Sequence, residues 1–189
     1  VAKATITVKA DAKSRVYGAA NPTLTATITG YVNSETSTAI SGAAAVATAA
    51  TTTSTVGDYA ITAAAGTLSA TNYDFSFTVG TLTVSKAALT VTAEAKSRTY
   101  GDANPTLTAT ITGFKNGETS AVLTGTPALS TTATTASSVA SYAITAALGT
   151  LASGNYSFGL VEGVLAVTKA PLTVTADHQS RVYGAADPT

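Results

Sequence analysis

The residue types best suited to binding chemistry in this chain are an arginine and a tyrosine two positions apart. Arginine beside tyrosine is a pairing that can hold a sugar or a carboxylate, so these side chains are the candidate ligand contacts. The pair occurs three times in the sequence, as Arg15 and Tyr17, as Arg98 and Tyr100, and as Arg181 and Tyr183.

The same pairs have a structural interpretation, which we favour. A tyrosine can bury its ring beside a core with its hydroxyl bonded to backbone, and an arginine can cover an edge with its aliphatic stem. The glycine that follows each tyrosine supplies an unusual backbone angle. A repeated scaffold needs its folding residues in every copy, whereas a receptor site is needed in only one.

Acid chemistry would centre on Glu35 and Glu118, the acidic residues that recur unchanged in both full copies. We expect them to pair with Arg15 and Arg98 or to cap the turn that follows them. A catalytic role would need a second matched carboxylate. The single histidine, His178, has no matching metal ligand or base, and the chain has no cysteine. We therefore predict no enzyme activity, no metal site and no cofactor.

A covalent cross-link is a minor alternative for the recurring lysine, asparagine and glutamate residues. Intramolecular bonds of this kind join a lysine to an asparagine beside a carboxylate and lower the intact mass by one ammonia each. The residues that recur in suitable positions are Lys3, Asn33 and Glu35, and Lys86, Asn116 and Glu118.

All of these residues belong to a long internal repeat. Arg15, Arg98 and Arg181 follow one another at intervals of 83 residues, and the surrounding sequence repeats with them. A fixed long period is typical of an array of copied modules. We therefore predict one module over residues 1–85, a second over 86–168, and the start of a third over 169–189.

Composition excludes partners that are selected by charge. Only 11% of the residues are charged, with ten basic and ten acidic side chains. No long-range field attracts nucleic acid, and no apolar run is long enough to insert into a membrane. We expect no nucleic-acid partner and no membrane insertion.

Alternating apolar and polar residues predict an all-β fold of immunoglobulin-like, β-sandwich-like modules. Residues 5–8, 23–29 and 59–63 alternate with the period of a strand, and three aromatic residues share one face over 73–77. About six short strands are expected per repeat, with a helical turn near Glu35. The alternative is a β-grasp-like sheet carrying that turn as its helix.

The junction between the full repeats lacks a flexible linker. Residues 81–92 lead from the last strand of one copy into the first strand of the next, with no glycine-rich or proline-rich stretch between them. The modules should therefore not swing freely. Residues 169–189 carry too few apolar side chains to fold alone, so they should fray or add as a strand to the second module or a neighbouring chain.

With these residues set out, the repeat resembles the MBG domain of the YGX type. The resemblance rests on residues 17–22, 30–33, 57–61, 72–75 and 80–84, and on their counterparts in the second copy. It covers essentially the whole chain. Ala140 in place of a glycine and Asp187 in place of an asparagine depart from the pattern.

The resemblance implies tandem modules of a large adhesin-like bacterial protein at the cell surface or secreted. The first functional expectation is a stalk or spacer that projects a functional tip and contacts mainly its neighbouring repeats. The alternative is an adhesin module that binds a host or matrix glycan or protein through its arginine and tyrosine positions. Self-association by strand addition through 169–189 is a further expected route.

Overall fold

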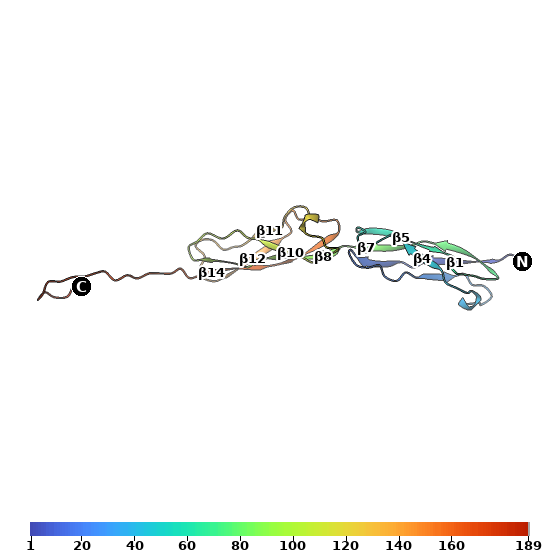
Figure 1. Ribbon diagram of the computed structural model, residues 1–189, viewed down its shortest axis with the longest axis horizontal. Helices are drawn as coiled ribbons and strands as arrows, with labels where there is room; N and C mark the ends of the chain where they lie inside the picture. Colours follow the sequence, from blue (N-terminus) through green and yellow to red (C-terminus); the bar gives the residue numbers. More distant parts are fainter. Residues whose placement is uncertain (189) are drawn as a thin grey trace.

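The computed structural model describes residues 1–188, and each full repeat forms a module of seven strands (Figure 1). The strands of the first module are β1 (Ala4–Ala10), β2 (Lys13–Val16), β3 (Ala26–Thr29), β4 (Ala45–Thr48), β5 (Gly57–Ala64), β6 (Tyr73–Thr78) and β7 (Gly80–Ser85). Those of the second are β8 (Ala87–Ala93), β9 (Lys96–Thr99), β10 (Ala109–Thr112), β11 (Ala128–Ser130), β12 (Ser141–Ala147), β13 (Tyr156–Val161) and β14 (Gly163–Thr168). The predicted all-β class is confirmed.

Each module contains two sheets. In the first module β3, β1 and β6 form one sheet, and β2, β7, β5 and β4 form the other. The second module repeats this order with β10, β8 and β13, and with β9, β14, β12 and β11. The chain passes from one sheet to the other through very short connections between β1 and β2 and between β6 and β7, and through longer ones at β2–β3, β3–β4 and β5–β6.

The expectation of about six strands missed β2 and its counterpart β9. Arg15 lies at an inward-facing position of β2, where the pattern of a half-buried strand requires an apolar residue. Its pairing partner is β7, about seventy residues further along the chain, in parallel register. A polar residue in the core position concealed the alternation on which sequence-based assignment depends.

Helical structure within residues 1–188 is confined to two short 3₁₀ turns, η1 (Ser37–Ala39) and η2 (Ser120–Val122). The β-grasp-like alternative, one sheet carrying a helix, is therefore not the arrangement found. Asn33 and Asn116 do not cap these turns; they lie in the left-handed region with φ of 55° and 54°. In η2 the side chain of Thr119 accepts the capping hydrogen bond instead.

The core of the first module spans both sheets. Ile6 and Val8 of β1 are fully buried with Tyr73 of β6, while Ile61 of β5 and Leu82 of β7 form the adjoining cluster. Large apolar side chains of this kind contribute roughly 1.5–3 kcal/mol each on burial. The corresponding residues of the second module are buried in the same way.

The sheet crossover depends on close backbone approach. A Cβ atom on Gly80 would lie 2.3 Å from the carbonyl oxygen of Ala10, and one on Gly163 would lie 2.4 Å from that of Ala93. No larger residue fits there without movement of backbone. Glycine at this position is therefore a packing requirement.

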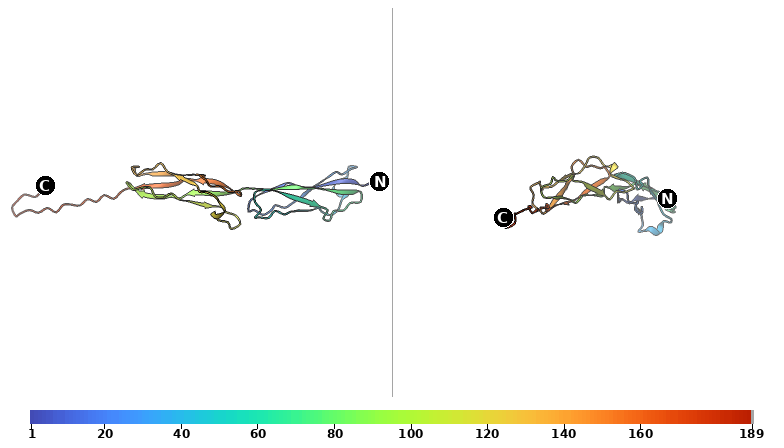
Figure 2. Two further views of the ribbon diagram at one scale, coloured as in Figure 1. Left: turned by 90° about the horizontal axis from the view of Figure 1, so that it is seen from above. Right: turned by 60° about the vertical axis from the view of Figure 1, so that its left-hand side comes forward.

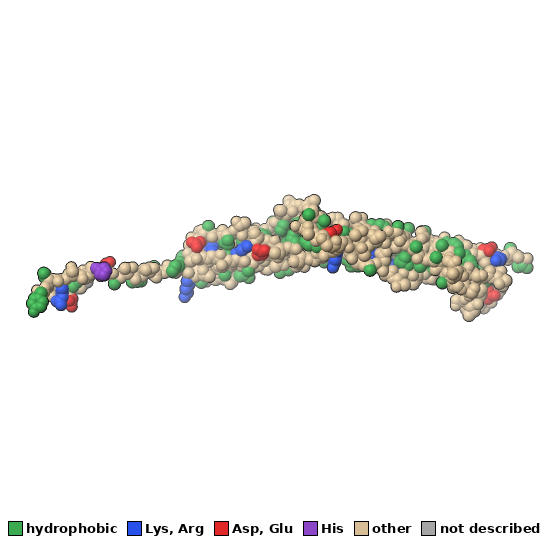
Figure 3. Space-filling model, in the orientation of Figure 1, with side chains coloured by type: hydrophobic (Ala, Val, Ile, Leu, Met, Phe, Trp, Pro, Cys, Tyr) green, Lys and Arg blue, Asp and Glu red, His purple; other side chains and the backbone are tan. Residues whose placement is uncertain are grey.

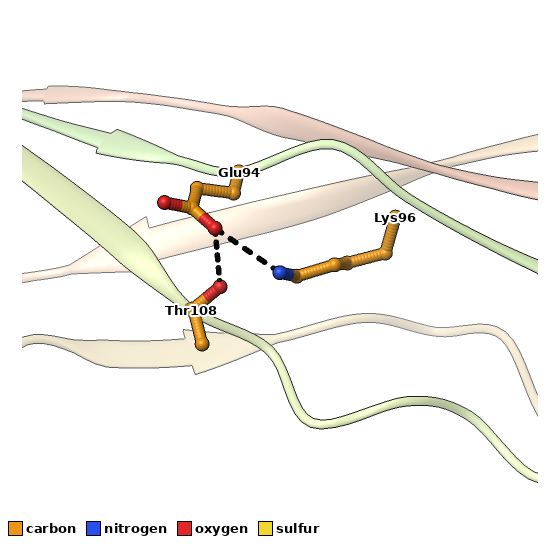
Figure 4. Close-up of polar contacts among 3 residues, drawn as sticks. All are labelled: Glu94, Lys96 and Thr108. Carbon is orange, nitrogen blue, oxygen red and sulfur yellow. Dashed lines mark hydrogen bonds and ion pairs between the residues drawn. The ribbon is translucent and has the colours of Figure 1, made fainter.

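A carboxylate ties the crossover to the neighbouring strand. Glu94 accepts hydrogen bonds from Thr108, at 2.6 Å, and from Lys96, at 3.1 Å (Figure 4). These contacts, led by the threonine hydroxyl, lower the pKa of Glu94. In the first module Asp11 accepts from two threonine hydroxyls, which lower its pKa in the same way. Both carboxylates accept hydrogen bonds from residues of their own module, so these contacts stabilise the fold of that module.

The two modules lie end to end along the long axis of the molecule (Figures 1 and 2). Lys86 alone separates β7 from β8, as the absence of a linker in the sequence predicted. Residues 169–188 form no strand and extend away from the second module. The tail does not add to the second module, so strand addition to another chain stays a prediction.

Candidate functional site at the module junction

Tyr17 of the first module forms the centre of the junction with the second. Its ring packs edge-on against that of Tyr156, with centroids 5.5 Å apart, and its hydroxyl donates to Oε1 of Glu118 at 2.6 Å. The residue is only 3% exposed. Its position follows from β2, which ends at Val16, and from a backbone hydrogen bond of 2.8 Å to Ser85 at the end of β7.

Glu118 joins tyrosines from both modules. Its second oxygen, Oε2, accepts from the hydroxyl of Tyr156 at 2.5 Å, and that hydroxyl in turn accepts from the backbone of Lys115 at 2.9 Å. The bond to Glu118 is the main cause that raises the pKa of Tyr17. Burial first, and then the same carboxylate, raise the pKa of Tyr156. The carboxylate therefore holds two neutral hydroxyl donors.

Two further hydrogen bonds cross the junction. The backbone N–H of Val56 donates to the side-chain oxygen of Asn155 at 3.1 Å, and the side chain of Asn116 donates to the carbonyl of Thr52 at 3.3 Å. Below them an apolar cluster draws on both modules. Its buried members are Tyr17, Val84, Ala87, Leu89 and Tyr156. The junction thus has a small core of its own with polar bonds around it.

Gly18 completes the fit. Its φ of 79° lies in the left-handed region, and a Cβ atom there would lie 2.3 Å from the Cβ of Lys115 in the second module. Glycine is therefore needed for two separate reasons, backbone conformation and close approach between modules.

Arg15 serves the loop beside the junction. Its guanidinium donates to the side chain of Asn21 at 2.8 Å and also to the carbonyl of Thr51, while Asn21 donates to the carbonyl of Ala50 at 2.6 Å. Arg15 is only 7% exposed. The arginine thereby fixes the loop that presents Thr52 and Val56 to the second module.

Arg98 repeats this arrangement in the second module. Its guanidinium donates to Asn104 at 2.8 Å and to the carbonyl of Thr134, and Arg98 is likewise 7% exposed. In the tail, Arg181 forms an ion pair of 3.0 Å with Asp187, which occupies the asparagine position. Both residues are largely exposed there.

The arginine and tyrosine of a pair do not converge on a common ligand surface. Arg15 faces the loop of its own module, whereas Tyr17 faces the next module. The expectation that the tyrosine hydroxyl bonds to backbone is wrong for Tyr17, which bonds to a carboxylate. Tyr100 is 48% exposed, and Tyr183, which lies in the strand-free residues 169–188, is 107% exposed.

Two expectations about the glutamates are corrected. Neither Glu35 nor Glu118 pairs with an arginine or caps a turn; Glu35 accepts from the hydroxyl of Tyr73 within the first module. The sequence could not disclose this, because the relevant partner of Glu118 is a tyrosine 101 positions away in another module. The sequence pattern assigned no site role to Lys115 or to Asn155, although Asn155 belongs to a repeated motif and recurs in the first copy as Asn72.

The cross-linking residues are engaged elsewhere in the second module. The ammonium of Lys86 donates to the carbonyl of Ser153 at 2.9 Å, while the amide of Asn116 contacts the first module. No cluster of three or more potential metal ligands occurs within residues 1–188. Over the same residues, no helix has the length and apolar character needed to cross a bilayer.

The family comparison divides the chain in the same way as the fold. Residues 6–83 and 89–166 each match the family model of the MBG domain (YGX type). The resemblance inferred from the repeated residues is thereby confirmed. No curated protein matches the chain.

Proposed function

Because the chain belongs to the MBG domain (YGX type) family, we propose that it works as a stiff spacer within a large adhesin-like bacterial surface or secreted protein. The observation that carries this proposal is the junction, where Tyr17 and Tyr156 share the carboxylate of Glu118. The small apolar core and the hydrogen bonds of the junction hold the two modules in one relative orientation, so the pair keeps its two ends at a set distance.

The connection between modules supports the same role. One residue, Lys86, lies between β7 and β8, so the chain itself leaves little freedom for bending. The surface carries scattered single charges among neutral residues (Figure 3). Such a surface suits a spacer, which separates the parts of a protein on either side of it and attracts few partners by charge.

The disposition of the arginines favours a spacer over a glycan-binding module. The guanidinium groups of Arg15 and Arg98 donate hydrogen bonds to backbone carbonyls and side-chain amides in their own modules. A sugar or carboxylate ligand would have to displace these bonds. The same reasoning favours a structural role over an enzymatic one, since the polar groups that converge at the junction are bonded to one another.

A distance distribution between the modules tests the proposal. The chain has no cysteine, so Val79→Cys and Val161→Cys, both at exposed sites, give unique spin-label positions. A spacer predicts one narrow distance distribution and an elongated X-ray scattering profile. A broad distribution, as from two freely hinged modules, would contradict it. Saturable binding of a glycan that Arg98→Ala abolishes in a folded protein would favour the alternative.

A further inference from the structure

In each module the first and last segments of the chain lie side by side and run in the same direction. In the first module the first segment (residues 4–16) contains β1 and β2, and the last segment (residues 73–85) contains β6 and β7. β1 pairs with β6 over six residue pairs, and β2 pairs with β7 over four, all in parallel. The register is the same in both sheets, since Ala4 pairs with Tyr73 and Val16 with Ser85, each 69 positions later.

The second module repeats this pairing. β8 pairs with β13 and β9 pairs with β14, again in parallel. A backbone hydrogen bond closes each end of the paired segments. In the first module the N–H of Ala4 donates to Asn72 at 3.0 Å and that of Tyr17 donates to Ser85 at 2.8 Å. The two corresponding bonds of the second module have the same lengths.

Tension along the molecule loads these segments at opposite ends. The chain enters the first module at β1 and leaves it at the end of β7, and the strands run along the long axis (Figures 1 and 2). A pull draws Ala4 toward one end and Ser85 toward the other, so the segments must slide past each other. In this shear geometry the evenly spaced hydrogen bonds of the parallel pairs carry the load together. Strands that are peeled apart from one end lose their bonds one at a time.

The loaded strands also lie inside their sheets. β1 lies between β3 and β6, and β7 lies between β2 and β5. Each is therefore paired on both sides, and neither can leave its sheet from a free edge. In the second module β8 and β14 hold the same interior positions.

Core packing opposes the same sliding movement. Ile6 and Val8 of the first segment and Leu82 and Val84 of the last segment are at most 1% exposed. A slip of one residue in register would turn such a set of side chains to the outer face of its sheet. Sliding would therefore expose apolar side chains in addition to breaking hydrogen bonds.

From this geometry we propose that each module bears tension, with the parallel pairing of its first and last segments acting as a shear clamp. The proposal deepens the spacer function, on which it rests, because an element that links two separated parts of a protein also transmits pulling forces between them. Lys86 alone lies between β7 and β8, so load passes from the clamp of one module directly to that of the next.

Pulling the chain in two directions tests the clamp. Because the chain has no cysteine, two introduced cysteines define the attachment points for single-molecule force spectroscopy. Ala2→Cys with Lys169→Cys loads both modules end to end, in shear. Ala2→Cys with Thr71→Cys is the matched control, since it pulls apart the neighbouring ends of β1 and β6 and peels these strands from one end. All three positions are exposed and lie outside the strands, so both variants should fold.

We expect end-to-end loading to unfold the two modules in separate steps, each at a force several-fold higher than peeling requires at the same loading rate. Forced unfolding follows the unfolding rate, so the direction of pulling changes the barrier while the core stays the same. Denaturant unfolding of the two variants should confirm equal stability. Equal forces in both directions, or a lower force end to end, would overturn the proposal. A narrow distance distribution without load would still support the spacer in that case.

Discussion

The hydroxyl of Tyr17 in the first module donates a hydrogen bond of 2.6 Å to the carboxylate of Glu118 in the second. The two residues are far apart in sequence, and their contact joins two units that each have a core of their own. A tyrosine that belongs to the repeat motif thereby acts in the packing of one repeat against the next. The consequences can be measured on the intact chain.

Removing the hydroxyl should loosen the junction while both modules stay folded. Tyr17→Phe keeps the ring against Tyr156 and deletes one hydrogen bond to a charged acceptor, worth about 1.5–3 kcal/mol. We expect the distance distribution between Val79→Cys and Val161→Cys labels to broaden. Tyr183→Phe is the matched control, because Tyr183 is fully exposed. An unchanged distribution in Tyr17→Phe would show that the bond does not hold the modules.

Two glycine variants separate backbone strain from contact between modules. Gly18→Ala and Gly101→Ala both place a side chain in the left-handed region, at φ of 79° and 90°. Only the first brings a Cβ atom to 2.3 Å from Lys115. We expect both to lower the stability of their own module by about 1–2 kcal/mol. Gly18→Ala alone should change the X-ray scattering profile of the pair, and an equal change in Gly101→Ala would argue against this.

Alkaline pH should release the junction before it unfolds the modules. The hydrogen bond to Glu118 raises the pKa of Tyr17 above its ordinary value of about 10. The docked state therefore binds the phenolic proton more tightly than the undocked state. Its contribution to docking is fully present below about pH 10 and is lost as the pH rises through the raised value.

The measurement follows tyrosinate absorbance and the label distance over the same alkaline titration. In the unmodified chain the distance should broaden together with the late tyrosine ionisation. Tyr17→Phe should lose part of that late absorbance change and should already have a broadened distribution at neutral pH. Broadening that precedes all tyrosine ionisation would exclude this linkage.

The arginine variants distinguish a folding role from ligand binding. Arg98→Ala removes donors to Asn104 and to the carbonyl of Thr134 and leaves both acceptors in a mostly buried site. We expect the second module to lose about 3 kcal/mol of its free energy of unfolding. Hydrogen exchange of β12 and β14 reports that loss. Arg181→Ala in the exposed tail should leave it unchanged, and unchanged exchange in Arg98→Ala would instead support a ligand contact.

The repeat itself, the all-β class and the direct connection between modules were all readable from the residues. The alternation of apolar and polar residues over 59–63 is a local pattern, and the recurrence of Arg15 as Arg98 is a periodic one, so both can be recognised in the sequence. The strand containing Arg15 was not readable, because a charged residue held by hydrogen bonds replaces an apolar one at an inward position. Arg15 can be buried because Asn21 and Thr51, which the fold places beside it, accept its hydrogen bonds.

The role of the repeated tyrosine was decided by tertiary structure alone. Tyr17 and Tyr100 occupy the same position of the repeat, two residues after an arginine and directly before a glycine, yet one is 3% exposed and the other 48%. Local sequence determines that each directly follows its strand and precedes a glycine. Tyr17 is buried because Glu118 and Tyr156 of the second module pack against it. Such a contact depends on how whole modules pack, so no periodic pattern in the sequence reveals it.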